Sequence, residues 1–498
     1  MSLNTKYLKL ATIKSKNHEI VLLTYGIALF LFILYLFTIN NTAIDGDYQM
    51  KIFIMSWVGV LTFIYILLSG GKITGSIFTP YTIFILFFFL FNYGQPIMWA
   101  IGIHMPKEIG VAPIYPGQPV ATGLDIFKAQ IYTIACIWMM HFGALIAINK
   151  KTYRFDDRKL YQNEIYMIEK IRLNNIIFKV SAVFALISIP VTLWAAFQDL
   201  QVAREYGYRA LYYSEHARTG ASITGFFLLW FFPSLIGLLI GSNYNSRVRK
   251  IVYLTMAIYT LLLVASGDRG PWIYKLITLV WLSHATYKPL TKGKVIKFLF
   301  LSIIGVYLLD AIVSLRNSGI NLESIFNSLS LNNSSIVKAF YEMGSSMNTT
   351  LYIQKFGGEF WPHGNTYLLA IGGLVTNRTL DLFGLSYGVL GEYLRQHLGI
   401  SWGPGFSILA EPLINFGPIF APLFMLILGL IIAKLFYHDS SINIQNQPLR
   451  LLFLVSSLDV LIRVNRDSIH VPLKNWFYGA FFFCLIIYFI KEMSITKQ

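Results

Sequence analysis

The chain has 498 residues, of which 55% are hydrophobic and only 13% are charged, and its mean hydropathy is +0.58. A soluble protein cannot bury that much apolar surface, so the composition excludes a soluble protein and indicates a polytopic membrane protein. The formal net charge of +16 fits basic connections beside anionic lipids, and no nucleic-acid partner is expected.

Hydropathy predicts twelve membrane-spanning helices, because apolar runs of about 20 residues recur along the chain. Each must be helical, since lipid offers no hydrogen-bond partner to an open backbone. The expected spans are 20–39, 52–69, 77–102, 127–148, 175–196, 222–241, 249–266, 271–286, 295–314, 418–436, 450–464 and 471–490. No small-residue cleavage site follows the first run, so we expect an anchor and not a cleaved signal peptide.

Lys and Arg gather in alternate connections, and this orients the chain. The short basic connections are NKKTYRFDDRK (149–159), SRVRK (246–250) and KPLTKGK (288–294). By the positive-inside rule these connections and both termini are expected in the cytoplasm. The basic residues outside are more often Arg, whose planar guanidinium binds phosphate or carboxylate through two hydrogen bonds.

One outer connection is long and dense in ionisable groups. Residues 315–417 separate an N-terminal bundle of about nine spans (1–314) from about three C-terminal spans (418–498). A membrane protein that keeps such a loop outside is expected to bind or react there. Cys136 and Cys484 fall inside spans, so no disulfide is expected in this loop.

Two outer segments have the pattern of surface helices. In 336–351 apolar residues recur at helical spacing, with polar residues such as Thr349 on the opposite side. Segment 198–218 mixes four Tyr, among them Tyr212, with three Arg. These Tyr side chains are expected at the membrane interface or stacked on sugar rings.

Four arginines are expected near the outer ends of spans, two of them, Arg269 and Arg316, at the depth of the lipid headgroups. Arg269 lies between two glycines in SGDRGPW (266–272), and Arg316 follows the ninth expected span. Arg269 could instead belong to a tight, solvated hairpin, and Arg316 could extend to the interface as a lone side chain. Arg463 and Arg466 come where the eleventh span ends, and Arg463 lies near the apolar depth, where a charge needs a partner or a cavity.

GPGFSILAEPLINFG (403–417) contains Glu411 directly before Pro412. Proline restricts the residue before it, so a rigid break is expected at Glu411, just before the tenth span. A carboxylate placed there could accept a proton, pair with an arginine or cap a helix.

The chain has no Walker loop and no GxGxxG motif that opens a helix after a strand. Nucleotide hydrolysis is therefore not expected to supply energy through this chain. Asp45 and Asp47 in the DGD of the first outer loop are an incomplete ligand set for a divalent metal, and no His/Cys pattern indicates zinc. We expect no metal and no other cofactor, with a metal at the DGD pair as the open alternative.

Three motifs together resemble a known family. SGDRG after a span, GPGFSILAEPLINFG entering the next-to-last group of spans, and LIRVNRDS near the C-terminus are similar to the Wzy-type O-antigen and oligosaccharide repeat-unit polymerases of bacteria. The similarity covers roughly residues 262–470. It implies a GT-C-like glycosyltransferase, working without a metal, that joins oligosaccharides linked to polyprenyl (undecaprenyl) diphosphate on the outer face of the bacterial plasma (inner) membrane. Its partners would be these lipid-linked substrates, membrane lipids, a flippase and a chain-length regulator.

The chemistry of such a transfer requires the same residue types. The lipid diphosphate gains negative charge as its bond to the anomeric carbon breaks, and positioned arginines stabilise that charge. The expected diphosphate ligands are Arg269, Arg316, Arg463 and Arg466. A carboxylate or imidazole helps to remove the proton of the attacking hydroxyl, so Glu411 is expected as the base or as the group that orients an arginine. His397 is the reserve base. Sugar contacts are expected from Tyr212 and Trp402.

Two other functions stay open. A glycan ligase transfers a finished chain from the same lipid by nearly the same chemistry, and the GFSILAEPLINFG stretch favours the polymerase. A flippase or transporter of lipid-linked sugars should place charges at mid-membrane, often in broken helices of repeated halves. Here the ionisable residues gather mostly on one face and no internal repeat is found.

Overall fold

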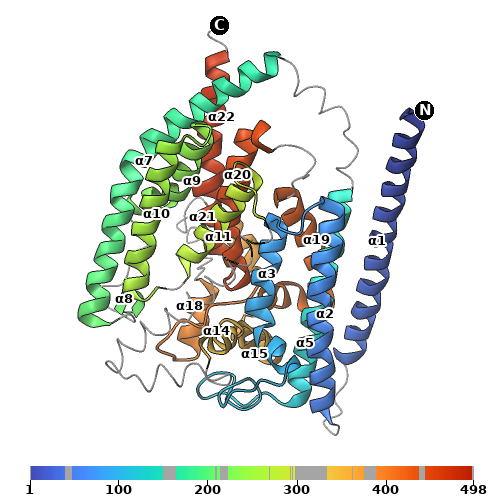
Figure 1. Ribbon diagram of the computed structural model, residues 1–498. Helices are drawn as coiled ribbons and strands as arrows, with labels where there is room; N and C mark the ends of the chain where they lie inside the picture. The colour runs from blue at the N-terminus through green and yellow to red at the C-terminus, as the bar shows by residue number, and fades with distance from the viewer. Residues whose placement is uncertain are drawn as a thin grey trace. The chain divides into compact units, whose positions relative to one another are not determined.

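Figure 1 shows the computed structural model of the chain, whose described elements are helices joined by loops. The structure describes residues 2–39, 47–149, 164–207, 210–213, 223–268, 270–291, 293, 295, 297, 334–361, 363–374, 389–436 and 444–495. Within these ranges two isolated β-bridges in the loop 101–122 are the only β structure. The all-α class expected from the sequence is therefore confirmed.

The chain forms two compact units that interleave along the sequence. One comprises Met1–Arg154, Phe326–Ser441 and Val464–Ile469, and the other comprises Phe155–Ile325, Ile442–Arg463 and His470–Gln498. The first unit thus combines the earliest spans with the described part of the expected outer loop. The division into 1–314, 315–417 and 418–498 follows topology rather than packing, and it stays a prediction.

The first unit is built around α5. Its helices are α1 (Ser2–Ile39), α2 (Tyr48–Thr74), α3 (Pro80–Asn92), α4 (Gly94–Ala100), α5 (Gly123–Asn149), α14 (Ser335–Met343), α15 (Ser346–Phe360), α16 (Thr366–Gly372), α18 (Leu390–His397) and α19 (Ala410–Phe436). α5 packs against α1, α2 and α19, and Figure 1 shows α2 and α5 running side by side. The most apolar stretch of α5 is 89% buried, so α5 is the core helix of this unit.

Two glycines allow α5 and α19 to approach closely. A Cβ at Gly143 would lie 2.1 Å from the carbonyl oxygen of Leu426, and a Cβ at Gly429 would lie 1.9 Å from that of Met140. Small residues at such crossings let helix backbones meet in a membrane, where close packing drives helix association. Gly429 therefore fixes α19, the helix that contains Glu411 in its first turn, against the core helix.

The second unit contains the long helix α7 and the helices that pack on it. Its elements are α7 (Glu164–Tyr206), α8 (Ala210–Tyr213), α9 (Ile223–Gly241), α10 (Ser246–Ser266), α11 (Pro271–Ala285), α20 (Pro448–Leu461), α21 (His470–Trp476), a π-helical turn (Phe477–Phe481) and α22 (Phe482–Ile495). α7 packs against α9 and α10. Between α11 and α20, the Lys275 ammonium lies 2.7 Å from the Asp459 carboxylate, and both side chains are largely buried.

Seven described helices are long and apolar enough to cross a membrane, and the pair α3 and α4, bent by 78° at its break, is an eighth candidate. They coincide with eight expected spans. The apolar helix Gly225–Gly241 is shorter, α11 and α20 have 15 and 14 residues, and most of the expected span 295–314 lies outside the described residues. The chain is thus a multi-pass membrane protein, and the count of twelve stays a prediction.

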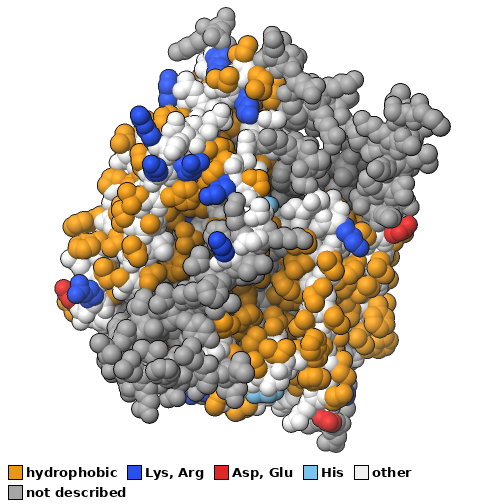
Figure 2. Space-filling model, viewed as in Figure 1, with side chains coloured by type: hydrophobic (Ala, Val, Ile, Leu, Met, Phe, Trp, Pro, Cys, Tyr) orange, Lys and Arg blue, Asp and Glu red, His pale blue; other side chains and the backbone are white. Residues whose placement is uncertain are grey.

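The lipid-facing character of these helices is visible on the surface. Apolar side chains cover much of the face shown in Figure 2. On α2 the exposed large apolar residues are Met50, Phe53, Ile54, Trp57, Leu61, Ile64 and Leu68. Such a surface would be costly in water and is expected against lipid tails.

The surface helix expected over 198–218 is wrong in its first part, because α7 continues to Tyr206. Neither glycine nor proline occurs between Pro190 and Gly207, so nothing in the sequence stops the helix earlier. It ends where Gly207 adopts φ +82. Tyr212 lies in the short α8, and its side chain is outside the described part of the structure.

The single surface helix expected over 336–351 is two helices, α14 and α15, which are interrupted at Gly344. A Cβ at Gly344 would lie 2.6 Å from the backbone nitrogen of Gln95, so the chain turns where α4 approaches. Thr349, expected on the polar side, is fully buried, and its hydroxyl hydrogen-bonds that of Tyr115 at 2.8 Å. The loop 101–122, which periodicity could not place, covers that side of α15.

Candidate functional site

Two motifs that are far apart in the sequence lie against each other in the first unit. The amide of Phe406 donates a hydrogen bond of 2.8 Å to the carbonyl of Arg466. Gly405 precedes it with φ +71, and a Cβ there would lie 2.9 Å from the same carbonyl oxygen. Glycine is suited to both the dihedral and the close approach. The GPG of the first motif therefore lets the chain pass directly over the second.

Asn92, at the end of α3, joins the same two segments. Its side-chain oxygen accepts a hydrogen bond of 2.7 Å from the Ser407 hydroxyl, and its Nδ2 donates one of 3.1 Å to the Asn465 carbonyl. All three side chains are fully buried. Because a buried polar group without a partner is costly, these bonds favour a single arrangement of the two segments.

Glu411 lies in the first turn of α19, and both of its carboxylate oxygens accept hydrogen bonds. Oε1 accepts from the Thr366 hydroxyl at 2.9 Å, and Oε2 accepts from the Ile469 amide at 2.8 Å. Thr366 in turn accepts a bond of 2.7 Å from Asn415. Glu411 is 2% exposed. The carboxylate thus ties the start of α19 to the segment 464–469.

The break expected at Glu411 lies at Gly417 instead, where φ is 69° and ψ is 176°. Pro412 falls in the first turn of α19, where a missing N–H costs no intrahelical hydrogen bond. Proline therefore starts this helix and does not interrupt it. Gly417, followed by Pro418, supplies the break.

Arg466 is half-buried, and its guanidinium lies 5.7 Å from the centre of the Phe91 ring. Within the described residues it forms no ion pair. An arginine stacked on an aromatic face can still bind an anion with the edge of its guanidinium. Arg395 of α18 differs, because its hydrogen bonds to Glu392 neutralise it and hold the pKa of Glu392 below its usual value.

The other expected ligands are distributed differently. Arg463 belongs to the second unit, where it is half-buried and close enough to Lys275 to act on it electrostatically. Arg269 and Arg316 lie outside the described residues. Asp268, next to Arg269, is 4% exposed. A tight, solvated hairpin would instead have exposed this side chain to water.

The expected reserve base and sugar contact lie on the first unit. His397 is exposed at the end of α18 and packs edge-on against the Phe360 ring at 5.7 Å. Trp402 is 39% exposed, and the centroid of its ring lies 6.0 Å from the centroid of the Tyr115 ring. No hydrogen bond joins His397 to Glu411 in the structure's described part.

Of the DGD pair, Asp45 lies outside the described residues. Asp47 caps α2, since its side chain accepts a hydrogen bond of 3.0 Å from the Gln49 amide. Where the structure describes the chain, no group of three or more metal-binding side chains occurs. A helix cap accounts for Asp47 without a metal.

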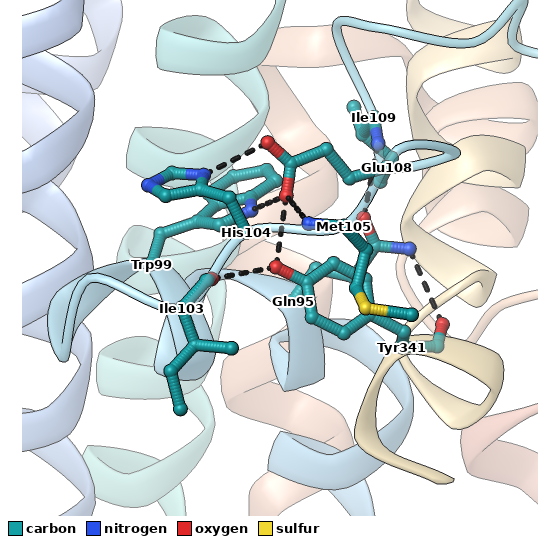
Figure 3. A network of polar contacts seen from close by, with 8 residues as sticks. All are labelled: Gln95, Trp99, Ile103, His104, Met105, Glu108, Ile109 and Tyr341. Atoms are coloured by element: carbon teal, nitrogen blue, oxygen red, sulfur yellow. Dashed lines mark hydrogen bonds and ion pairs between the residues drawn. The ribbon is translucent and has the colours of Figure 1, made fainter. Parts of the chain in front are cut away.

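The sequence reasoning missed Glu108, in the loop between α4 and α5 (Figure 3). Its Oε2 accepts hydrogen bonds from Trp99 Nε1 at 2.9 Å, from the Met105 amide at 3.0 Å and from the Tyr341 hydroxyl at 2.8 Å. Its Oε1 lies 2.8 Å from His104 Nδ1. The available signal was an ionisable pair at spacing four in a loop rich in Gly and Pro.

Tyr341 and Gln95 extend this network to α14 and α4. The Tyr341 hydroxyl also lies 2.7 Å from the Ile103 carbonyl oxygen, so its one proton is shared between this oxygen and Glu108 Oε2. Burial together with Glu108 raises the pKa of Tyr341, so the hydroxyl stays neutral. Gln95 donates to the Tyr341 carbonyl at 3.2 Å and accepts from the Ile109 amide at 3.0 Å. The loop is therefore fixed against two helices of the first unit.

The described structure defines a multi-pass, all-helical membrane protein whose first unit brings two polar motifs together at the start of α19. A family model described as O-antigen polysaccharide polymerase Wzy matches residues 20–498, nearly the whole chain, and the chain belongs to this family. No curated protein and no solved structure matches it. The family expected from three motifs is confirmed, and the match also covers the N-terminal spans.

Proposed function

We propose that this protein is a glycosyltransferase that polymerises oligosaccharide repeat units carried on polyprenyl diphosphate, on the outer face of the bacterial plasma membrane. Membership of the Wzy family supports the polymerisation of O-antigen repeat units. The main structural support is Arg466, a half-buried arginine that forms no ion pair among the described residues, at the point where the two motifs meet.

In the proposed reaction a sugar hydroxyl of one lipid-linked repeat unit attacks the anomeric carbon of the growing chain. The new C–O bond forms as the bond from the anomeric carbon to the diphosphate breaks, and the electron pair leaves with the diphosphate. The proton of the attacking hydroxyl passes to a base, for which His397 is the candidate. Arg466 binds this leaving group, with Arg269, Arg316 and Arg463 as further ligands. A fixed guanidinium lowers the barrier because the diphosphate is more negative in the transition state than in the bound substrate.

Glu411 acts in this proposal as a positioning residue. Its two oxygens are both engaged and it is 2% exposed, so its contact with the Ile469 amide holds the segment that contains Arg466. The sequence led us to expect Glu411 either as the base or as the group that orients an arginine, and the proposal takes the second role. The exposed His397 remains available as a base, and Trp402 and Tyr212 remain the proposed sugar contacts.

The proposed topology has twelve spans, a GT-C-like arrangement and both termini in the cytoplasm. It places the start of α2, the loop 101–122 and the helices α14 and α15 on the outer side. In support, these segments meet in the first unit: the Tyr115 hydroxyl of the loop hydrogen-bonds that of Thr349 in α15 at 2.8 Å. At the start of α5, Lys355 of α15 lies 3.5 Å from Asp125, and a Cβ at Gly123 would lie 2.8 Å from that of Tyr48 in α2. A flippase and a chain-length regulator are the proposed protein partners, and no cofactor is required.

The test is deletion of the gene in its host, followed by the size distribution of lipid-linked and surface glycans. Single repeat units on the outer face, without longer chains, are the expected result. Full-length chains held on the lipid carrier would show a ligase instead, and single units held on the inner face would show a flippase. Either of these two results would overturn the proposal.

A further inference from the structure

A cavity with a volume of about 1040 Å³ lies beside the Glu108 network. Pockets for small molecules typically have roughly 300–1,000 Å³, so this one is large enough for several sugar rings. Its walls come from the first turns of α2, the loop 101–122 and the start of α5, all in the first unit. Its polar and aromatic lining residues include Asp47, Tyr48, Gln49, Trp99, His104 and Glu108.

The contact with Glu108 determines which ring nitrogen of His104 carries the proton. An ionised carboxylate only accepts hydrogen bonds, so His104 Nδ1, 2.8 Å from Glu108 Oε1, carries a proton. In the neutral imidazole the other nitrogen, Nε2, is then an acceptor. The His104 side chain is 61% exposed while that of Glu108 is 10% exposed, so the carboxylate is the fixed support and the imidazole faces solvent.

The lining chemistry decides the class of ligand. The cavity wall contains the carboxylates of Asp47 and Glu108, and none of its lining residues is Lys or Arg. The Lys51 ammonium lies beside this wall, over the Tyr48 ring and 4.5 Å from its centre. The wall itself lacks the arginines expected to bind a diphosphate. Hydroxyl groups are donors that carboxylate and imidazole acceptors can bind. The Trp99 and Tyr48 side chains, 4% and 8% exposed, form part of the wall behind these acceptors.

We propose that this cavity is a carbohydrate-binding site for the oligosaccharide of the repeat unit, in which His104 accepts a hydrogen bond from a sugar hydroxyl through Nε2. The proposal rests on the proposed function, and it assigns sugar binding to a place separate from the arginine that binds the diphosphate. Glu108 is a positioning residue here, because it acts through His104.

The experiment measures binding of the host's repeat-unit oligosaccharide after release from its lipid, so that the probe has no diphosphate. Calorimetry on the full chain in nanodiscs compares two matched variants, Val111→Trp and Val120→Trp. Both valines are exposed on the same loop, but only Val111 lines the cavity. We expect Val111→Trp to weaken binding at least tenfold by filling the cavity, and Val120→Trp to bind like the unaltered protein.

His104→Asn tests the hydrogen bond itself. The Asn amide can still donate to Glu108, whereas the acceptor at Nε2 is lost. We expect binding to weaken about tenfold, the usual order for one polar contact to a ligand. Unchanged binding in this variant would contradict the role of His104, while equal losses in both Trp variants, or no binding by the unaltered protein, would contradict the site.

Arg466→Lys separates this inference from the proposed function. This variant should bind the released oligosaccharide normally and fail only with the diphosphate-linked substrate. If the unaltered protein makes no polymer from lipid-linked units, the proposed function fails whether or not the cavity binds sugar. If it makes polymer but Val111→Trp still binds the oligosaccharide fully, only the cavity proposal fails.

Discussion

Phe406 and Arg466 are joined through their backbones, with the amide of Phe406 2.8 Å from the carbonyl oxygen of Arg466. This bond connects the motif that opens α19 with the motif that follows α20 in the sequence. Main-chain contact fixes the Cα position of Arg466, and its guanidinium lies over the Phe91 ring, 5.7 Å from the ring centre. The fold therefore positions the guanidinium before any substrate binds. Such preorganisation is what stabilisation of a developing charge requires.

Gly405→Ala should abolish polymer formation. The residue has φ +71, and its new Cβ would lie 2.9 Å from the Arg466 carbonyl oxygen, so the two motifs must separate. The matched control is Gly399→Ala, which has φ +62 and no atom within 4 Å of the new Cβ. Both variants bear the strain of a positive φ, of order 1 kcal/mol, but only Gly405→Ala should lose polymer in gels of surface glycan. Equal activity of the two variants would show that the close approach is unimportant.

Glu411→Gln and Thr366→Val should each lower thermal stability, by about 1–3 kcal/mol, because each leaves a buried polar group without its partner. The double variant should lose less than the sum of the two, since both remove the same hydrogen bond. Unfolding in detergent provides the four free energies. Strict additivity would mean that the Glu411–Thr366 contact does not stabilise the protein.

The same Glu411→Gln variant also separates a positioning role from a base. If Glu411 orients the segment 464–469, the residual activity should show the same pH profile as the unaltered protein, with a lower maximum. Loss of the acid limb of the profile in the variant would assign the proton to Glu411. In vitro elongation measured from pH 5 to pH 9 gives both curves.

Sequence patterns predicted the long apolar helices that a lipid bilayer requires. α1, α2, α5 and α10 coincide with expected spans, since a long apolar run must be helical in a bilayer. Periodicity could not show where such a helix ends outside the apolar depth, and α7 continues to Tyr206 because no residue stops it. It also could not show that Gly417, and not Pro412, breaks α19.

The site was predictable in part. Glu411 and Arg466 were selected by residue type and position, and the structure brings their segments together through Ile469 and Phe406. Glu108 was missed because its significance depends on Trp99 and Tyr341, and Tyr341 is distant from it in the sequence. A carboxylate in a loop shows no pattern until its donors are known.

Gly429→Ala should reduce the folded protein recovered from membranes. The new Cβ would lie 1.9 Å from the Met140 carbonyl oxygen, so α19 must move away from α5, and overpacking of this kind costs typically about 1–3 kcal/mol. Gly70→Ala is the control, because it is also helical and has no atom within 4 Å of its new Cβ. Thermal unfolding should distinguish them, and equal melting temperatures would refute the tight crossing.

Lys275→Met should destabilise the second unit strongly, because it leaves the buried Asp459 carboxylate without its cation. Loss of one partner of a buried ion pair costs about 3–5 kcal/mol, whereas replacing both by apolar residues is often neutral. We therefore expect Lys275→Met/Asp459→Leu to recover most of the stability, as measured by protease resistance in membranes. A double variant as unstable as the single one would mean that the pair has a role beyond mutual neutralisation.

Elongation by the purified protein tests the central claim most directly. The full chain in nanodiscs receives only lipid-linked repeat units, and product lengths are compared for the unaltered protein, Arg466→Lys and Arg395→Lys. Arg395 is the matched arginine, since Glu392 already neutralises it. We predict chains of many units from the unaltered protein and from Arg395→Lys, and single units only from Arg466→Lys. Full-length chains from Arg466→Lys would contradict diphosphate binding by Arg466, and no chains from the unaltered protein would contradict the polymerase itself.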